Sequence, residues 1–205
     1  MLRRIPFAHM MNLRDLGGYP TRDGRETAWR RLLRSDAPVC LTPEEIDWLR
    51  RERITTVLDL RSPEEMRRNP CALAGLEGFD YHPMPAMGGA SLPPEDRVWE
   101  GYRDILADHG FMARALRILA NAPGGALFHC TAGKDRTGTL AAALLLLAGV
   151  DRQDIVADYQ VSHTYIKPLL ERMRVAVPDL PAYVGRSDAE TMEQLLDWFE
   201  QTYGG

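Results

Sequence analysis

The sequence predicts an α/β domain with a small, mainly parallel central sheet flanked by helices and a helical C-terminal third. Three observations support this. The first half alternates strand-like and helix-like segments. A short apolar run ending at residue 129 is followed closely by a strongly apolar helical segment, and helical patterns dominate after residue 150. The length of 205 residues suits one domain, so we expect a single domain over residues 1–205.

The N-terminal part is predicted to be β-rich and to lead into a helix. Asp23-Gly24, between YPTR and RETAW, is a hairpin signal. The segment LTPEEIDWLRRE that follows predicts a helix, because Thr42 can cap its N-terminus, proline takes the first helical position and Glu45 completes a capping box.

A strand, a helix and a second strand are expected next. Residues 54–60 are apolar and β-branched, which is typical of a buried strand. Ser62 and Glu65, with proline between them, repeat the helix-start pattern, and residues 79–85 alternate weakly as a further strand. The glycines and prolines of 86–94 indicate a loop.

Helical patterns fill most of the remaining chain. Residues 122–130 are the exception and predict a turn followed by a strand. Helices are expected at 95–108, at 111–121, from Thr137 to a stop at Gly149, twice within 151–176, and at the C-terminus, where Ser187 and Glu190 would cap the last helix.

Bulk properties exclude several classes of protein. The net charge of −4 gives no reason to expect nucleic-acid binding. The longest apolar stretch, 140–150, is too short to span a bilayer, and the N-terminus lacks the apolar core of a signal peptide. We therefore expect no integral membrane association and a cytoplasmic location, while secretion without a signal peptide stays open.

The cysteines and histidines give no indication of disulfide bonds or of a metal site. Three cysteines, at 40, 71 and 130, form no C-x-x-C pair and suit a reducing compartment. The histidines are scattered and make no metal constellation with them. We expect no metal and no cofactor.

The segment HCTAGKDRTG, residues 129–138, has the features of an anion-binding loop that carries a nucleophile. It lies between a predicted strand and a predicted helix, where free helix N–H groups and the helix dipole attract anions. Gly133 and Gly138 would let backbone and ligand approach closely, and Arg136 offers donors that match a phosphate. The same surroundings favour the thiolate of Cys130, which would make it a nucleophile.

A nucleotide-binding P-loop does not explain this segment. The Walker pattern needs glycine where Phe128 stands and serine or threonine where Asp135 stands. Neither position matches the Walker pattern, which makes a kinase-like function a poor alternative.

HCTAGKDRTG resembles the signature loop HC-x5-R-[ST] of cysteine-dependent protein tyrosine phosphatases. More narrowly, it resembles that of bacterial tyrosine phosphatases of the lipid-phosphatase-like group. The blocks MNLRDLGGYPTRDGR, VLDLRSPEE and IVADYQVS look like further blocks of the same group, so the resemblance covers most of residues 12–165.

The resemblance implies roles for the loop residues. Cys130 would attack phosphorus and form a phosphocysteine, and Thr137 would hydrogen-bond Cys130 and help to hydrolyse this intermediate. His129 would orient the loop and support the thiolate. The phosphoryl oxygens would be held by the Arg136 guanidinium and by backbone N–H groups of the loop, namely those of Thr131, Ala132, Gly133, Lys134, Asp135 and Arg136.

The resemblance leaves the general acid open among three aspartates. Many relatives use an Asp on a W-P-D-type loop, and no such tripeptide exists here. Asp135 is the first candidate because the narrower group carries Asp inside the signature loop. Asp59 is the second and Asp96 the third. Lys134 resembles the extra loop cation of lipid-acting relatives, which would admit phosphoinositides.

Simpler interpretations of the charged residues stay open from the residues alone. Lys134 could be a solvated surface lysine. Asp135 could pair with a neighbouring arginine or cap the helix. Asp59 could be a buried cap or arginine partner without chemistry, and Arg61 is expected to be structural.

The predicted function is hydrolysis of phosphomonoesters through a phosphocysteine on Cys130, releasing inorganic phosphate. Phosphotyrosine-containing proteins or peptides are the expected substrates, with phosphoserine, phosphothreonine and phosphoinositides as additions. One alternative is a non-catalytic phosphate-binding module. The other is a redox enzyme, such as arsenate reductase or a rhodanese-like sulfurtransferase; reduction would need a resolving cysteine, for which only Cys40 and Cys71 are available.

Overall fold

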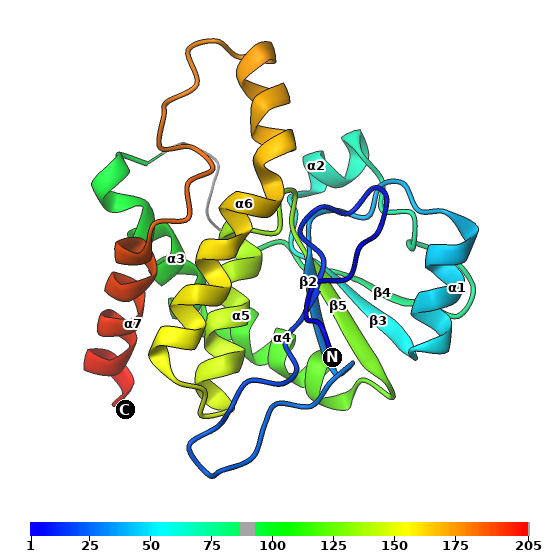
Figure 1. Ribbon diagram of the computed structural model, residues 1–205, viewed down its shortest axis with the longest axis horizontal. Coiled ribbons are helices and arrows are strands. Elements are labelled where there is room, and N and C mark those ends of the chain that lie inside the picture. The colour runs from blue at the N-terminus through cyan, green and yellow to red at the C-terminus, as the bar shows by residue number, and fades with distance from the viewer. Residues whose placement is uncertain (87–92, 205) are drawn as a thin grey trace.

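A five-stranded sheet forms the centre of the molecule (Figure 1). The computed structural model describes residues 1–86 and 93–204. The strands are β1 (Arg14–Asp15), β2 (Leu32–Ser35), β3 (Ile54–Asp59), β4 (Asp80–Pro83) and β5 (Gly125–His129), in the spatial order β1-β2-β5-β3-β4. Only β1 runs antiparallel to its neighbour. The predicted small, mainly parallel sheet is confirmed.

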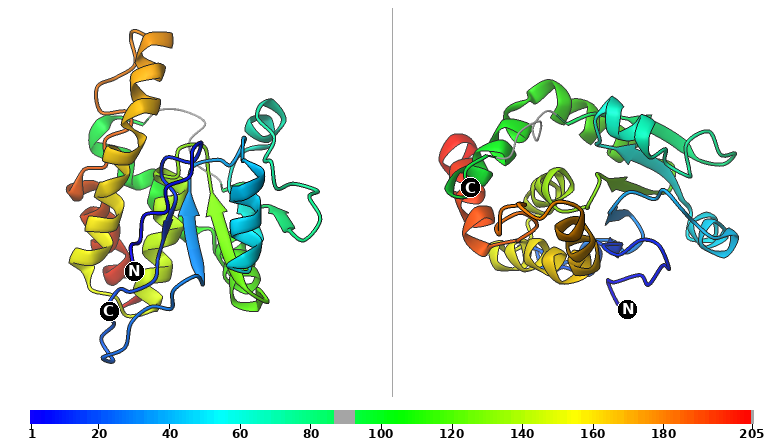
Figure 2. Two further views of the ribbon diagram at one scale, coloured as in Figure 1. Left: turned by 45° about the vertical axis from the view of Figure 1, so that its right-hand side comes forward. Right: turned by 90° about the horizontal axis from the view of Figure 1, so that it is seen from above.

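Helices cover both faces of this sheet (Figure 2). They are α1 (Pro43–Arg51), α2 (Pro63–Arg68), α3 (Val98–Ala107), α4 (His109–Asn121), α5 (Asp135–Leu147), α6 (Arg152–Ala176) and α7 (Ala189–Tyr203), with a 3₁₀ turn, η1 (Glu95–Arg97), before α3. The predicted helical C-terminal third is confirmed as α5 to α7.

The alternation of side chains along the strands divides the core into two clusters. Leu58 and Phe128 point to one face and pack with buried residues of α3 to α7. Val57 and Leu127, their neighbours along each strand, point to the other face and pack with α1 and the N-terminal segment. Central strands that are apolar on both faces are typical of a parallel sheet covered by helices.

Two capping boxes begin helices α1 and α2 as predicted. Thr42 accepts from the backbone N–H of Glu45, and the Glu45 carboxylate accepts in return from the backbone N–H of Thr42. Ser62 and Glu65 make the same reciprocal pair.

The C-terminal region corrects two expectations. Residues 151–176 were expected to form two helices and instead form α6, which runs through Pro168. Ile166 and Leu170, one turn apart on either side of the proline, are both buried, so packing holds the two halves on one axis although the proline lacks a backbone N–H. The N-cap of α7 is Asp188 rather than Ser187, and its side chain makes no cap hydrogen bond.

Two further segments were predicted to be a hairpin and a loop. The segment around Asp23-Gly24 forms a hairpin-like turn with one isolated bridge, Pro20 to Glu26, instead of regular strands. In the predicted loop 86–94, residues 87–92 lie outside the described residues. Among the helices that the structure describes, none combines the length and apolar character needed to cross a membrane.

Candidate active site

Residues 130–134 connect the C-terminal end of β5 to the N-terminus of α5, at the middle of the sheet. Cys130 directly follows β5, which lies between β2 and β3, and its residue is 2% exposed. This is the edge at which parallel α/β sheets bind ligands. The strand, loop and helix around Cys130 are therefore arranged as the sequence predicts.

Gly133 of the loop and Gly138 of α5 both stand close to other segments of the protein. Gly133 has a φ of +67°, and a Cβ there would stand 2.4 Å from the carbonyl oxygen of Ser35 at the end of β2. A Cβ at Gly138 would stand 3.1 Å from the Tyr159 ring of α6 and 3.2 Å from Arg34. The glycines therefore let other segments of the protein approach this part of the chain closely, and the close approach of a ligand stays a prediction.

Arg136 lies in the first turn of α5 and is held by Glu65. Two guanidinium nitrogens donate to the two Glu65 carboxylate oxygens, at 2.7 and 2.8 Å. Burial opposes the charge, but the hydrogen bonds to Glu65 raise the pKa of Arg136 above its ordinary value. The same carboxylate accepts from the Thr131 hydroxyl. Glu65 thus connects the first residue of the loop after Cys130 to the arginine at its end.

Asp135 is the one candidate acid that stands at the mouth of a cavity. Its side chain is 45% exposed, and its Oδ1 accepts from the Tyr102 hydroxyl and lies 3.1 Å from the Lys134 ammonium. The Tyr102 hydroxyl in turn lies 2.8 Å from that of Tyr159. Asp135 is therefore fixed by two neighbours without being buried.

The cavity beside Asp135 has a volume of about 220 Å³ and is partly apolar. Val98 and Ile105 contribute apolar side chains from α3, and Val184 contributes another from the segment between α6 and α7. Lys134, Asp135 and Arg136 form its wall on the loop side, while Cys130 does not line it. The cavity therefore adjoins the α5 end of the loop.

Lys134 is buried and is not a solvated surface lysine. Its ammonium donates to the backbone carbonyl of Arg186 at 2.5 Å and pairs with Asp135. Although burial works against the charge, the nearby Asp135 carboxylate raises the pKa of Lys134. Lys134 thus joins the loop to the segment that precedes α7.

Asp59 and Asp96 lie outside the wall of the cavity that Asp135 lines. Asp59 is fully buried and accepts two guanidinium hydrogen bonds from Arg61, at 2.9 and 2.6 Å, and one from the Tyr81 hydroxyl. Burial raises the pKa of Asp59, but these hydrogen bonds lower it below its ordinary value. Asp59 is therefore a buried arginine partner, as the simpler interpretation expects, and its role as an acid stays a prediction. Asp96 is exposed in η1, outside the cavity wall.

His129, at the end of β5, is fully buried beside the loop. Its Nδ1 lies 3.3 Å from the Cys130 carbonyl oxygen and its Nε2 lies 3.7 Å from Asp59. Burial lowers the pKa of His129 to about 4. With this pKa we expect the ring to be neutral near pH 7. The roles of His129 in orienting the loop and supporting the thiolate stay predictions.

The hydroxyl of Thr137 is buried and makes no hydrogen bond to any group that the structure describes. The expected hydrogen bond to Cys130 is therefore not formed here. Thr137 occupies the third position of α5 and is fully buried there. Its participation in hydrolysis stays a prediction.

The sequence interpretation missed two contributors to this site, Glu65 and Tyr102. Glu65 was recognised only as part of a capping box, and Tyr102 lies in a helix without any motif. Both act on loop residues through contacts between segments far apart in the chain, which no local pattern reveals. Within residues 1–86 and 93–204, no three His, Cys, Asp or Glu side chains are grouped as a metal site would require.

Comparisons with known proteins find similarity to tyrosine phosphatases. A family model described as the tyrosine phosphatase family matches residues 5–205. A tyrosine-protein phosphatase of Nostoc commune is 36% identical over 136 residues, which are 62% of this chain and 46% of that protein. The triple specificity protein phosphatase PtpB of Mycobacterium tuberculosis is 30% identical over 205 residues, 80% of this chain and 74% of that protein. The chain thus spans about half the length of the first relative.

Among solved structures, a kinase-associated phosphatase whose catalytic-site cysteine is replaced by serine has the same fold. Its TM-score is 0.51 at 15% identity, and the match covers 97% of this chain and 96% of that one. At this identity the likeness concerns the fold alone.

Proposed function

This chain belongs to the tyrosine phosphatase family, and on that premise we propose that it hydrolyses phosphomonoesters through a phosphocysteine on Cys130. The observation that carries the proposal is the placement of Cys130 directly after β5 and of Arg136 in the first turn of α5, on either side of one short loop. A nucleophile, a guanidinium and free helix N–H groups then converge on one anion.

In the proposed reaction, the Cys130 sulfur attacks phosphorus and the bond from phosphorus to the leaving oxygen breaks. Water then attacks the phosphocysteine, the sulfur–phosphorus bond breaks, and inorganic phosphate leaves. Arg136 hydrogen-bonds the phosphoryl oxygens, and its charge stabilises theirs. A guanidinium has five N–H donors, and the pairing with Glu65 uses two of them. Glu65 therefore orients Arg136 and leaves it donors for the substrate.

Asp135 is the proposed proton donor to the leaving group. Its Oδ1 is bound by Tyr102 and Lys134, while no described group hydrogen-bonds its Oδ2. The Oδ2 oxygen can therefore carry a proton towards the cavity. The leaving oxygen would need to come within hydrogen-bond reach of this atom.

Replacing Cys130 by serine tests the mechanism. We expect phosphate release from an aryl phosphate that is insensitive to EDTA and is abolished in Cys130→Ser, because a serine hydroxyl is not ionised near neutral pH. Retained turnover in Cys130→Ser contradicts the mechanism. Phosphopeptide binding without turnover by the native protein would favour the non-catalytic binding module instead.

Cys40→Ser and Cys71→Ser are matched controls that also address the redox alternative. All three cysteines are free, and burial raises the pKa of Cys71 to about 11, which disfavours the thiolate that a resolving cysteine needs. We expect both variants to keep full turnover. A loss in either one would favour reduction chemistry.

Phosphotyrosine-containing proteins or peptides are the proposed substrates. The partly apolar cavity beside Asp135 can accept an aromatic ring. We propose phosphoinositides only as an addition, since Lys134 lines the cavity but is engaged by Asp135 and the Arg186 carbonyl. Comparing phosphate release from a phosphotyrosine peptide and from phosphoinositide vesicles measures this preference.

The domain organisation and the location of the protein are also proposals. We propose a single domain, which is supported by one sheet with hydrophobic clusters on both faces. A thiol nucleophile must stay reduced, which supports a cytoplasmic location.

A further inference from the structure

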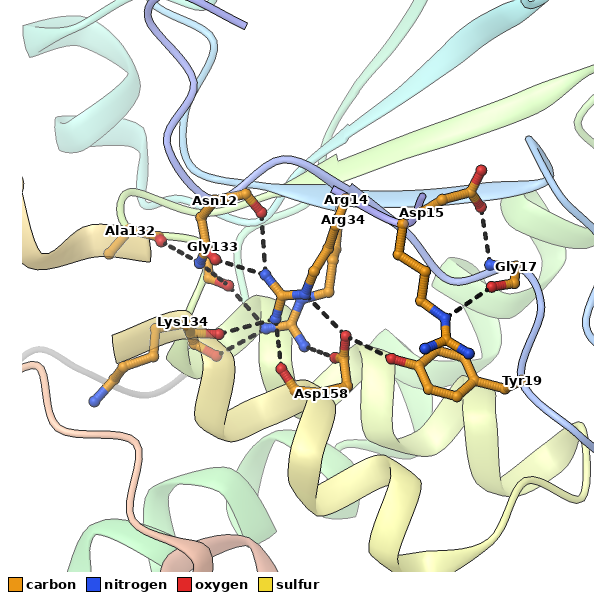
Figure 3. Close-up of polar contacts among 12 residues, drawn as sticks. Asn12, Arg14, Asp15, Gly17, Tyr19, Arg34, Ala132, Gly133, Lys134 and Asp158 are labelled. Carbon is orange, nitrogen blue, oxygen red and sulfur yellow. Dashed lines mark hydrogen bonds and ion pairs between the residues drawn. The ribbon is translucent and has the colours of Figure 1, made fainter. Parts of the chain in front are cut away.

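The carbonyl groups of Thr131, Ala132 and Gly133 are bound by groups that the proposed chemistry does not use. The Ala37 N–H donates to the Thr131 carbonyl at 3.2 Å. The side-chain amide of Asn12 donates to the carbonyls of Ala132 at 2.9 Å and Gly133 at 3.0 Å. Figure 3 shows Asn12 reaching both carbonyls.

Arg34 completes this set at the following peptides. One of its guanidinium nitrogens donates to the Gly133 carbonyl at 2.8 Å and lies 3.5 Å from the Lys134 carbonyl oxygen (Figure 3). The Thr131 carbonyl is thus bound by a backbone N–H, whereas the carbonyls of the two peptides that flank Gly133 are bound by side chains. Those are the peptides that glycine leaves most free to rotate.

Binding a carbonyl fixes the direction of the next N–H group. A trans peptide is planar, and its C=O and N–H bonds point in opposite directions. The carbonyls of Ala132 and Gly133 point towards Asn12 and Arg34, so the N–H groups of the next residues, Gly133 and Lys134, point away from them. The Lys134 carbonyl accepts from the Gly138 N–H of α5 at 2.8 Å, so the helix itself directs the N–H of Asp135. A run of N–H groups directed to one side is the arrangement that binds a phosphate.

Asn12 is itself held in one orientation. Its backbone N–H donates to Asp36 at 2.9 Å, and its side-chain oxygen accepts from Arg14 at 2.5 Å. Because Arg14 can only donate, the Asn12 carbonyl faces Arg14 and its NH₂ group faces the loop. Asn12 and Arg14 are both buried, so no solvent competes for these bonds.

Arg34 is held by Asp158 of α6, to which Arg14 also binds, at 2.8 Å (Figure 3). Two guanidinium groups therefore share this carboxylate, and Asp36 adds a second buried carboxylate through its contact with Asn12. Burial lowers the pKa of Arg34 to about 10, so the charge persists at neutral pH.

We propose that Asn12 and Arg34 are positioning residues that keep the N–H groups of the loop directed at the phosphate. The identity of the ligand as a phosphate rests on the proposed function. Neither side chain touches the reacting atoms; each acts through the carbonyls that it binds.

Asn12→Ala tests this inference by removing both amide donors. We expect the affinity for inorganic phosphate and the kcat for an aryl phosphate each to fall roughly tenfold or more, because misplaced N–H groups lose the phosphoryl oxygens. We expect kcat to fall by a larger factor than KM rises. Ile54→Val is the control for stability, since it removes a buried methyl group at the opposite end of the sheet.

The outcomes separate this inference from the proposed function. Phosphate affinity and kcat in Asn12→Ala within twofold of Ile54→Val overturn the positioning role. Weakened phosphate binding in Asn12→Ala, together with a native protein that has no turnover, supports the positioning role and contradicts the hydrolase. A native protein that binds no inorganic phosphate overturns the inference.

Arg34→Lys decides the question if Asn12→Ala does not fold. It keeps the charge but loses the fork that reaches both Asp158 and the loop. Arg31→Lys is its matched control, because Arg31 likewise binds backbone carbonyls, those of Leu119, Ala120 and Ala122 at the end of α4. We expect only Arg34→Lys to weaken phosphate binding. Equal affinities in the two variants overturn the inference.

Discussion

Asp135 is the residue whose surroundings best match the demand on a proton donor. It is partly exposed, fixed through one oxygen and placed at the cavity. We expect Asp135→Asn to lower kcat for a phosphotyrosine peptide by about 10²-fold or more, since positioned general acids contribute on that scale. For an aryl phosphate with a strongly acidic phenol, the loss should be much smaller, because that leaving group departs without a proton.

The comparison of the two substrates in one variant is the measurement. Asp96→Asn is the control, because Asp96 is an exposed acid outside the cavity wall. Equal losses of kcat for the two substrates would show that Asp135 positions the loop and is not the acid.

At the residue scale, the sequence predicted which side chains gather but not which of them pair. The short segment HCTAGKDRTG was enough to identify Cys130, Asp135 and Arg136, because the three lie close together in the chain. The choice between Asp135 and Asp59 could not be made in this way. It depends on Arg61 folding back onto Asp59 and on the burial of both, which are tertiary properties.

At the scale of elements, two capping boxes of the same chemistry differ in what their glutamates reach. Glu45 of α1 accepts from the backbone N–H of Ala8, whereas Glu65 of α2 binds Arg136. We expect Thr42→Ala and Ser62→Ala each to lower the free energy of unfolding by about 1 kcal/mol, as lost N-caps do. Only Ser62→Ala should also lower kcat, because it loosens the end of α2 that carries Glu65.

Urea unfolding and turnover of the aryl phosphate, measured on both variants, check this expectation. Thr42→Ala is the matched control for stability. If the two variants lose equal amounts of kcat, the effect belongs to general destabilisation, and the role of α2 in holding Arg136 is refuted.

The elements that local chemistry specifies were predicted well. Both capping boxes and the strand 54–60 follow from short-range patterns and are confirmed, the strand one residue shorter. The second half of α6 was not predicted to be continuous, since Pro168 stays helical only through the packing of Ile166 and Leu170 on the rest of the molecule. Tertiary packing here outweighs a local signal.

At the scale of the whole molecule, local sequence patterns could not predict the order of the strands or the polar contacts between distant segments. Asn12 binds residues 120 and 121 positions away, and Arg34 binds one 124 positions away. The block MNLRDLGG was recognised as part of a resemblance, but nothing in its sequence says that its asparagine turns back onto the loop. Topology brings these segments together, and only the fold reveals it.

The burial of His129 at the centre of the sheet should make the whole fold sensitive to acid. Burial lowers its pKa from 6.5 to about 4; the charge of Asp59 opposes the shift, and the charges of Arg61 and Arg136 add to it. Between these two values the unfolded chain binds a proton that the folded chain does not, so stability rises with pH. The contribution of His129 is therefore complete above pH 6.5 and is lost as the pH falls towards 4.

Urea unfolding between pH 7 and pH 4.5 measures this loss, which should reach about 2.5 kcal/mol at pH 4.5. The buried carboxylate of Asp158, whose pKa is lowered from 3.8 to about 2, loses its stabilisation mainly below this window, whereas Glu65, whose pKa is lowered from 4.5 by its hydrogen bonds to Arg136, begins to lose its own within it. The difference between the native protein and His129→Asn therefore reports on the histidine. In His129→Asn the pH dependence should flatten, whereas His9→Asn, which replaces an exposed histidine, should keep the native slope. An unchanged slope in His129→Asn would mean that the ring is protonated in the folded protein, and a cation beside Cys130 would then have to be added to the mechanism.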